Sequence, residues 1–260
     1  MRYIYTALVA ILLTANVCAD EPDKDLHNKC LYPSVMLTGT SLCPHLQGTG
    51  SGVIVKSVKQ DDKWHNFVLT VAHNLNETPE HECQQSNTGP IKVEQGYYYE
   101  VQVGVYENWS FLKEVQSFPC EIICDDDALD VAMVKFVTDE EMPTAEVNFD
   151  PKVYIGSDIC RVGCGLSEPF RIDFGKITAL PGSAGSRSPL LKETYRISAP
   201  TIQGDSGGPT FEDNKLIGLA EAIASMPTGP ISRPTPICHM VYVIPISEFL
   251  KHEEIKKILE

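Results

Sequence analysis

The chain has 260 residues, which suits one large domain or two small ones with a substantial core. Hydrophobic residues make up 43% and charged residues 22% of the chain, and this composition excludes a disordered protein. The net charge of −14 at pH 7 argues against nucleic acids and anionic membranes as partners.

The first segment, residues 1–19, is predicted to be a secretory signal peptide. A short basic start is followed by an apolar run from Ile4 to Val17 and by the small residue Ala19. The run is shorter than a membrane span requires. We therefore expect cleavage and a secreted or periplasmic protein without membrane contact, with an uncleaved anchor as the alternative. Residues 20–47 are interpreted as an N-terminal extension.

The number of cysteines also favours an exported protein. Of the nine cysteines, removal of Cys18 with the signal leaves eight, and an even number in an exported chain favours disulfides, up to four of them. The eight are Cys30, Cys43, Cys83, Cys120, Cys124, Cys160, Cys164 and Cys238. The two Cys-x3-Cys pairs could bind zinc instead, but export and scattered histidines favour bridges. No metal and no cofactor are expected.

Short apolar or alternating runs, separated by Gly, Pro, Asn and Asp, predict an all-β chain. Val, Ile, Tyr and Thr enrich these runs. The expected strands are Gly52–Val55, Phe67–Ala72, Tyr97–Tyr106, Val131–Phe136, Ile159–Val162, Leu216–Ala222 and Met240–Ile246. Their spacing is typical of a sandwich or a barrel. Acidic residues and a proline in residues 139–150 indicate a boundary between two β units.

One helix is expected, at the C-terminus over residues 247–260. Ser247 can cap its first turn. Apolar residues recur at helical spacing, at Phe249, Leu250, Ile255, Ile258 and Leu259, and His252, Lys256 and Lys257 are expected to face solvent.

The stretch GDSGGP, residues 204–209, admits two interpretations. It could be a tight turn, because Gly, Asp, Ser and Pro are typical turn residues. It could also be a loop that presents the hydroxyl of Ser206 as a nucleophile. A serine hydroxyl needs a base within hydrogen-bond reach, and the base needs an orienting partner. The choice therefore depends on the rest of the chain.

His73 is the candidate base, because it ends the buried-looking run Phe67–Ala72. A lone histidine in such a place is more often structural. The other histidines offer weaker candidates: His27, His45, His65, His81 and His252 are expected to be exposed, and His239 could be either buried or functional.

Asp130 is the candidate acid, because it comes directly before a buried-looking strand that starts at Val131. It could also simply end the acidic loop that begins at Asp125. Asp127, followed by Ala128 and Leu129, is a weaker version of the same pattern. The choice between Asp130 and Asp127 stays open at this stage.

The words LTVAHN, DVAMVKF and GDSGGP occur in this order and contain His73, Asp130 and Ser206. Together they resemble the chymotrypsin-like (trypsin-fold) serine peptidases. The resemblance extends from about Gly48 to the C-terminal helix. It implies two antiparallel six-stranded β-barrels, residues 48–145 and 146–246, with the site between them.

The resemblance also implies a role for each matched residue. Ser206 corresponds to the nucleophile, His73 to the general base and then acid, and Asp130 to the acid that holds the histidine tautomer. The backbone N–H groups of Gly204 and Ser206 correspond to the oxyanion hole.

The chain departs from the digestive-type members, because it has no Ile-Val-Gly-Gly-like word after a basic residue. The stretch GTGSGVIV, residues 48–55, instead resembles the bacterial, HtrA-like members, which are made without zymogen cleavage. Those members usually carry Asn in place of Asp205, and eight mature cysteines are foreign to them. A buried Asp205 needs a cationic or donor partner, which the sequence does not identify.

The resemblance places a substrate pocket around five residues. They are Pro200, Thr201, Gln203, Glu221 and Ala222. Pro200 brings no charge and Thr201 only a hydroxyl, so a small or medium uncharged side chain is expected before the cut. An inward-pointing Glu221 would instead favour Arg or Lys, and His239 would favour an acidic side chain.

The predicted function is a secreted serine endopeptidase that acts on proteins or peptides through an acyl-enzyme. A non-catalytic binding protein on the same fold is the alternative. An esterase or other acyl transferase is disfavoured, because the Gly-x-Ser-x-Gly elbow of that class leads into a helix. Here an apolar strand pattern follows Ser206. The oligomeric state is not indicated.

Overall fold

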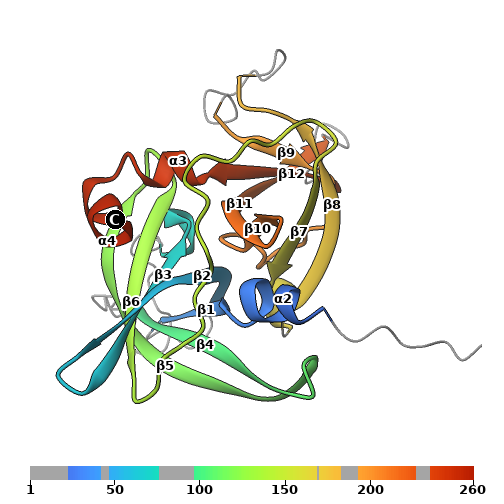
Figure 1. Cartoon of the computed structure of the whole chain (residues 1–260). Coiled ribbons are helices and arrows are strands. Elements are labelled where there is room, and N and C mark those ends of the chain that lie inside the picture. Colours follow the sequence, from blue (N-terminus) through green and yellow to red (C-terminus); the bar gives the residue numbers. More distant parts are fainter. Residues whose placement is uncertain (1–22, 42–46, 76–96, 169, 183–192, 227–234) are drawn as a thin grey trace, which may run out of the picture.

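The computed structural model describes residues 23–41, 47–75, 97–168, 170–182, 193–226 and 235–260. Their strands form two closed six-stranded barrels, antiparallel between neighbours, which lie side by side (Figure 1). This arrangement confirms the predicted all-β fold with a helical C-terminus. Across the described residues, no helix has the length and apolar character that a membrane crossing needs. The predicted signal peptide lies outside the described residues.

The first barrel closes in the order β1-β2-β3-β6-β5-β4. Its strands are β1 Ser34–Ser41, β2 Gln47–Gln60, β3 Lys63–Thr70, β4 Tyr97–Glu107, β5 Phe111–Asp126 and β6 Val131–Thr138. Ile54 and Val68 fill the barrel interior, whereas Val53 and Leu69 pack in the cluster between the barrels. Because both faces of β2 and β3 are buried here, these strands read as continuous apolar runs.

The second barrel closes in the order β10-β11-β12-β9-β8-β7. Its strands are β7 Asp158–Gly163, β8 Arg171–Ala179, β9 Tyr195–Ile197, β10 Pro209–Glu212, β11 Lys215–Met226 and β12 Thr235–Pro245. Ile177, Ile197 and Val243 are among the residues that fill its interior. The GDSGGP stretch connects β9 to β10 and lies at the end of this barrel that faces the first.

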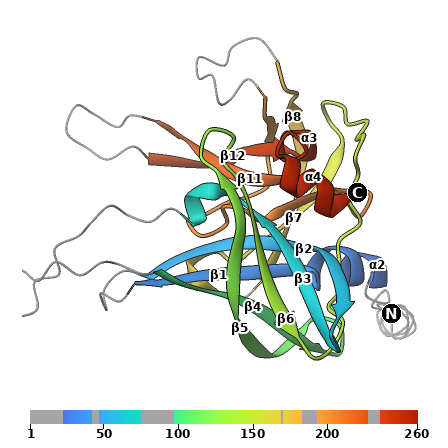
Figure 2. The same cartoon turned by 90° about the vertical axis from the view of Figure 1, so that its left-hand side faces the viewer.

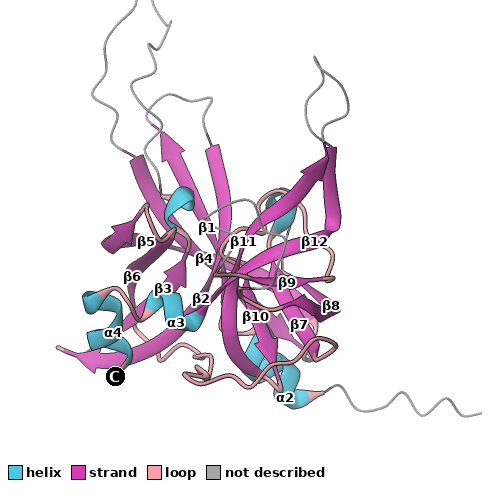
Figure 3. Cartoon of the chain, turned by 90° about the horizontal axis from the view of Figure 1, so that it is seen from above, coloured by secondary structure: helices cyan, strands magenta, loops and turns pink. Residues whose placement is uncertain are grey.

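The helical segments are short and lie at the periphery of the strands (Figure 3). They are α2 Lys24–Leu26, the π-helical turn η1 His27–Leu31, the 3-10 turns η2 Ala72–Asn74 and η3 Gly165–Ser167, α3 Ile246–Phe249 and α4 Glu253–Leu259. The terminal segments are exchanged between the barrels (Figures 1 and 2). η1 leads into the first barrel but contacts β7 and β11 of the second, whereas α3 and α4 follow the second barrel and contact β6 and β2 of the first.

Two predicted boundaries were wrong. The first barrel begins with β1 at Ser34, inside the stretch 20–47 that was interpreted as an extension. Only Val35 and Leu37 of β1 point into the barrel interior, so its small and polar residues concealed the strand. The C-terminal helix is broken into α3 and α4, and Pro245 rather than Ser247 occupies the N-cap position of α3.

Two histidines that were expected to be exposed are covered by tertiary contacts, His65 on β3 is half-buried as well, and His45 and His81 lie outside the described residues. His27 is buried, and its two ring nitrogens contact the carbonyl oxygen of Asp23 at 2.7 Å and Oγ of Ser110 at 2.8 Å. His252 occupies the N-cap position of α4 and is half-buried. In both cases a tertiary contact, which local polarity does not reveal, covers the ring.

The cysteines that the structure describes are all free thiols: Cys30, Cys120, Cys124, Cys160, Cys164 and Cys238. Cys43 and Cys83 lie outside the described residues. The thiols of Cys30 in η1 and Cys160 in β7 are hydrogen-bonded, and this bond, with burial, raises the pKa of Cys30 well above its usual value. The disulfides stay a prediction.

Candidate active site

His73 and Asp130 are brought together at the mouth of the first barrel. The buried residues Val71 and Ala72 anchor the end of β3, and His73 follows them in η2 with its side chain partly exposed. The carboxylate of Asp130 accepts the backbone N–H of His73 at 2.9 Å, and its other oxygen lies 2.8 Å from the ring Nδ1. A carboxylate can only accept, so Nδ1 carries the proton and Nε2 is left as the basic nitrogen.

The turn between β5 and β6 delivers Asp130. Oδ1 of Asp126 accepts the backbone N–H groups of Ala128 at 2.9 Å and Leu129 at 3.1 Å, which shapes the turn. Asp130 then adopts a left-handed backbone with φ of 53°, a conformation that Asp tolerates better than most residues. Of the two acids that the sequence left open, Asp130 contacts His73, whereas Asp127 is exposed in the turn.

The loop that carries Ser206 is held by the first barrel. The N–H of Ser51 in β2 donates to the carbonyl oxygen of Ser206 at 2.7 Å, and Nδ2 of Asn74 donates to the same oxygen at 2.8 Å. Oγ of Ser51 donates to the carbonyl oxygen of Gly204 at 2.9 Å. Since Asn74 is the residue after His73, these bonds fix the serine loop beside the histidine.

Two glycines allow the loop to take this path. Gly204 has a φ of 96° and Gly207 a φ of 81°, which are left-handed conformations that side chains disfavour. A Cβ on Gly207 would also lie 2.1 Å from the carbonyl oxygen of Ser51. The amides of Gly204 and Ser206 have no acceptor within the described part of the chain. They are therefore available to an oxygen of a ligand.

The hydroxyl of Ser206 has a partner in the second barrel. It donates to the backbone carbonyl oxygen of Glu221 in β11 at 3.2 Å, and no hydrogen bond joins it to His73 in the described structure. Catalytic hydrogen bonds are often long or misaligned without substrate. The hydroxyl must release the carbonyl oxygen of Glu221 before it can donate to His73.

Asp205 has the cationic partners that the sequence did not identify. Its fully buried carboxylate lies 2.9 Å from Nη2 of Arg161 in β7 and 2.9 Å from Nη2 of Arg171 in β8. The same oxygen, Oδ2, accepts the backbone N–H of Ile202 at 2.8 Å. Asp173 bridges the two arginines from the other side, at 3.0 and 2.6 Å. The signal in the sequence was a lone arginine in the apolar strand DICRVG, which needs a buried carboxylate.

The electrostatics of the site connect Glu221 to the His73–Asp130 pair. Burial lowers the pKa of His73, but the hydrogen bond to Asp130 and the charges of Asp130 and Glu221 outweigh it, so the pKa is raised. The pKa of the Glu221 carboxyl is raised to about 7, chiefly by burial and also by the charge of Asp130, while His73 opposes the shift. Oε2 of Glu221 is buried without a hydrogen-bond partner in the described structure. Glu221 therefore titrates in the pH range in which a histidine base works.

The expected pocket residues Pro200, Thr201 and Gln203 lie in the segment that leads from β9 to the serine loop. The carbonyl oxygen of Pro200 accepts a hydrogen bond from Nη2 of Arg161 at 2.6 Å. Thr201 is buried, and its hydroxyl donates to the carbonyl oxygen of Ala199 at 3.5 Å rather than lying free. Gln203 is exposed. None of these groups brings a net charge to the surface.

The remaining pocket residues are on β11 and β12. Glu221 and Ala222 follow one another in β11, and the backbone of Ala222 pairs with Tyr242 of β12. His239 on β12 is exposed, with Nδ1 3.3 Å from the carbonyl oxygen of Ser198. Half-buried Glu221 is thus the acidic group nearest to the serine in this set, and its backbone already contacts Ser206.

Two antiparallel β-barrels with a histidine, an aspartate and a serine at their junction define the fold class of the chymotrypsin-like serine peptidases. Comparison with known families matches residues 50–219 to the trypsin-like peptidase domain. The chain belongs to this family. No curated protein matches the chain at a significant level.

Proposed function

We propose that the chain is an exported serine endopeptidase that hydrolyses peptide bonds through Ser206, His73 and Asp130. The observation that carries the proposal is the pair of contacts from Asp130 to His73, with the serine loop fixed beside them. Family membership supports a peptidase and protein or peptide substrates. Export is proposed from residues 1–19, and no cofactor is required.

In the proposed mechanism, Oγ of Ser206 attacks the carbonyl carbon while Nε2 of His73 takes the hydroxyl proton. Asp130 keeps the proton on Nδ1 and stabilises the imidazolium. The amides of Gly204 and Ser206 donate to the oxyanion, and each such donor lowers the barrier by roughly 3–4 kcal/mol. The imidazolium gives its proton to the leaving amine, which leaves an ester on Ser206. Water, deprotonated by His73, then hydrolyses the ester and releases the acid.

The proposed enzyme needs no cleavage to order its serine loop. In the digestive-type subgroup, a new amine pairs with the acid before the serine. Here Arg161 and Arg171 already neutralise the corresponding Asp205. We therefore expect activity from the folded chain without a proteolytic step, and a preference for a small or medium uncharged side chain before the cut.

A fluorophosphonate probe tests the proposal, because it reacts with an activated serine. We expect labelling of the wild type and none of Ser206→Ala. Ser167→Ala is a matched control, because Ser167 is an exposed serine of the η3 turn and should not affect labelling. Peptide-library cleavage then reports the preferred side chain.

The alternative function is binding without catalysis. One observation favours it, namely that the Ser206 hydroxyl donates to Glu221 and not to His73. A folded wild-type protein that fails to react with the probe over a wide pH range would support this alternative and refute the proposed peptidase.

A further inference from the structure

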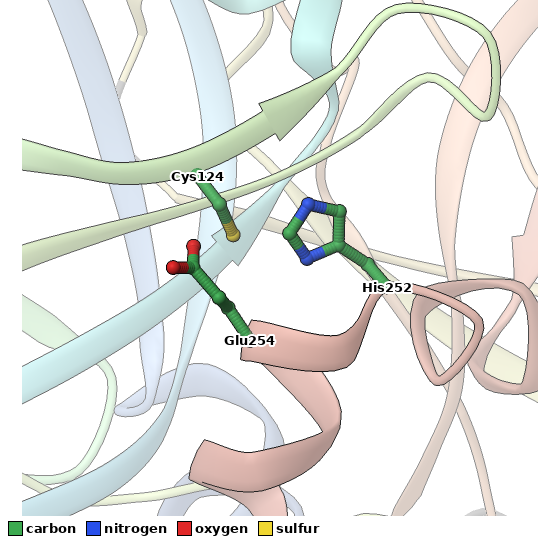
Figure 4. A group of neighbouring side chains, drawn as sticks. All are labelled: Cys124, His252 and Glu254. Atoms are coloured by element: carbon green, nitrogen blue, oxygen red, sulfur yellow. The ribbon is translucent and has the colours of Figure 1, made fainter.

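Three side chains with metal-ligating atoms converge where the C-terminal helix packs on the first barrel. They are Cys124 of β5, His252 at the N-cap of α4 and Glu254 in the first turn of α4 (Figure 4). One potential ligand atom from each residue lies within 4.8 Å of the other two. Figure 4 shows the thiol of Cys124 between the carboxylate of Glu254 and the imidazole of His252.

The backbone places these side chains by identifiable means. The pairing of β5 with β6 shifts register between Ile122 and Cys124, and such a bulge re-aims the side chains that follow it. Cys124 is consequently buried, at 8% exposure, and belongs to the cluster between the barrels. On the helix side, Ile255 is fully buried in the same cluster and anchors α4. The cluster of ligands is therefore built on two packed elements.

Two of the three ligating groups at this place lack hydrogen-bond partners, whereas the thiol of Cys124 has a hydrogen bond to the backbone of Met133. Nδ1 of His252 is buried and has no hydrogen bond in the described structure, which is costly for an imidazole nitrogen. The described residues likewise give Glu254 no ion pair and no hydrogen bond. Three lysines line the adjacent groove: Lys56 contacts the carbonyl oxygen of Ile258, Lys135 pairs with Glu121 at 2.9 Å, and Lys257 forms no ion pair within the described residues. The polar groups of the cluster thus have room for a further partner.

We propose that Cys124, His252 and Glu254 bind a zinc ion. One thiolate, one imidazole and one carboxylate form a ligand set that suits Zn²⁺. Zinc bond lengths with a tetrahedral arrangement put ligand atoms roughly 3.3–3.8 Å apart, so side-chain shifts of about 1 Å close the site. Glu254 also lines a groove of about 630 Å³ between α4 and the barrel, which gives the ion and a fourth ligand, water, access from solvent.

The ion would join the C-terminal helix to the first barrel. Cys124 pairs with Met133 near the start of β6, the strand that directly follows Asp130. His252 and Glu254 belong to the helix that follows the second barrel. A bound zinc would therefore tie α4 to the hairpin that carries Asp130. This inference concerns binding and stability, and it does not depend on the proposed peptidase activity.

Metal binding to the purified full chain tests the proposal. The protein is stripped with a chelator under reducing conditions and titrated with Zn²⁺ in competition with a chromophoric chelator. We expect one equivalent to bind and the melting temperature to rise. With Co²⁺ as a spectroscopic probe, a thiolate-to-cobalt charge-transfer band should appear in the near ultraviolet.

The variants separate this site from chance binding. Cys124→Ser should remove the band, and Glu254→Gln and His252→Gln should each lower zinc affinity at least about 100-fold. Cys120→Ser on the same strand and Glu253→Gln on the same helix are matched controls that should leave affinity unchanged. Glu254 is exposed, so Glu254→Gln remains informative if the cysteine variant does not fold. Three outcomes would each overturn the proposal. The charge-transfer band could survive in Cys124→Ser, or Glu254→Gln and Glu253→Gln could bind zinc with equal affinity. The third is a wild-type protein in which Cys124 forms a disulfide.

Discussion

Replacing Arg161 by methionine should destabilise the protein and disturb the serine loop. The substitution keeps an unbranched side chain of similar length but removes the guanidinium that contacts Asp205, Asp173 and the carbonyl oxygen of Pro200. Both Arg161 and Asp205 have side chains with 0% exposure, so water cannot replace the lost partner.

The magnitude follows from what remains around Asp205. Removal of one partner of a buried ion pair costs about 3–5 kcal/mol. Arg171 still pairs with the same carboxylate, although 35% of its side chain is exposed. We therefore expect the low end of the range, about 3 kcal/mol. For a domain of this size, this loss lowers the melting temperature by about 6–12 °C.

Thermal melts and a double-mutant cycle measure the effect. Asp205→Asn removes the charge but keeps an oxygen for the N–H of Ile202, so the double variant Arg161→Met/Asp205→Asn should recover part of the stability lost in Arg161→Met. Lys176→Met, at an exposed lysine on the neighbouring strand β8, is the control. A drop below about 2 °C in Arg161→Met, or strict additivity in the double variant, would refute the role given to this ion pair.

Three further outcomes are expected. Glu221→Gln should move the acidic limb of the pH profile of kcat/KM to lower pH. The charge of Glu221 raises the pKa of His73, and the neutral amide of glutamine does not. An acidic limb at an unchanged pH would contradict this coupling. Asp130→Asn should lower kcat about 10⁴-fold by favouring the wrong histidine tautomer, whereas Asp127→Asn should leave kcat near the wild-type value. A loss of kcat in Asp127→Asn and not in Asp130→Asn would show that Asp127 is the acid of the site. Gly207→Ala should lower stability by at least 1 kcal/mol, measured by denaturant unfolding, because it puts a Cβ against a β2 carbonyl oxygen at positive φ.

The strands that sequence reasoning found follow two patterns: β4 alternates between buried and more exposed residues, and others are buried on both faces. The predicted segments of β2, β3 and β6 are buried on both faces and are therefore apolar runs, and His73 and Asp130 flank such runs. β5 was missed because most of its side chains are exposed, and its residues show no strand-like alternation. β1 was missed for its small and polar residues. In these elements the pairing with neighbouring strands decides the structure, and this pairing cannot be inferred from a short stretch of sequence.

The site likewise has features that the sequence predicted and features that it did not. The motifs predicted the contact between His73 and Asp130, since each motif carries its own backbone geometry. The partners of Asp205 could not be predicted, because Arg161 and Arg171 lie on two strands that only barrel closure brings together. The orientation of the Ser206 hydroxyl and the burial of His252 likewise depend on contacts between distant segments.

The exchange of terminal segments has a consequence for the order in which the chain can fold during synthesis. β2 and β6 leave the ribosome long before α3 and α4, yet these helices cover the faces of both strands. The apolar surface that Phe249 and Ile255 will bury therefore stays open until the last residues are made. Barrels already fold slowly because their contacts are distant in sequence. A nascent chain of this protein should consequently remain prone to aggregation until the C-terminal helix has docked.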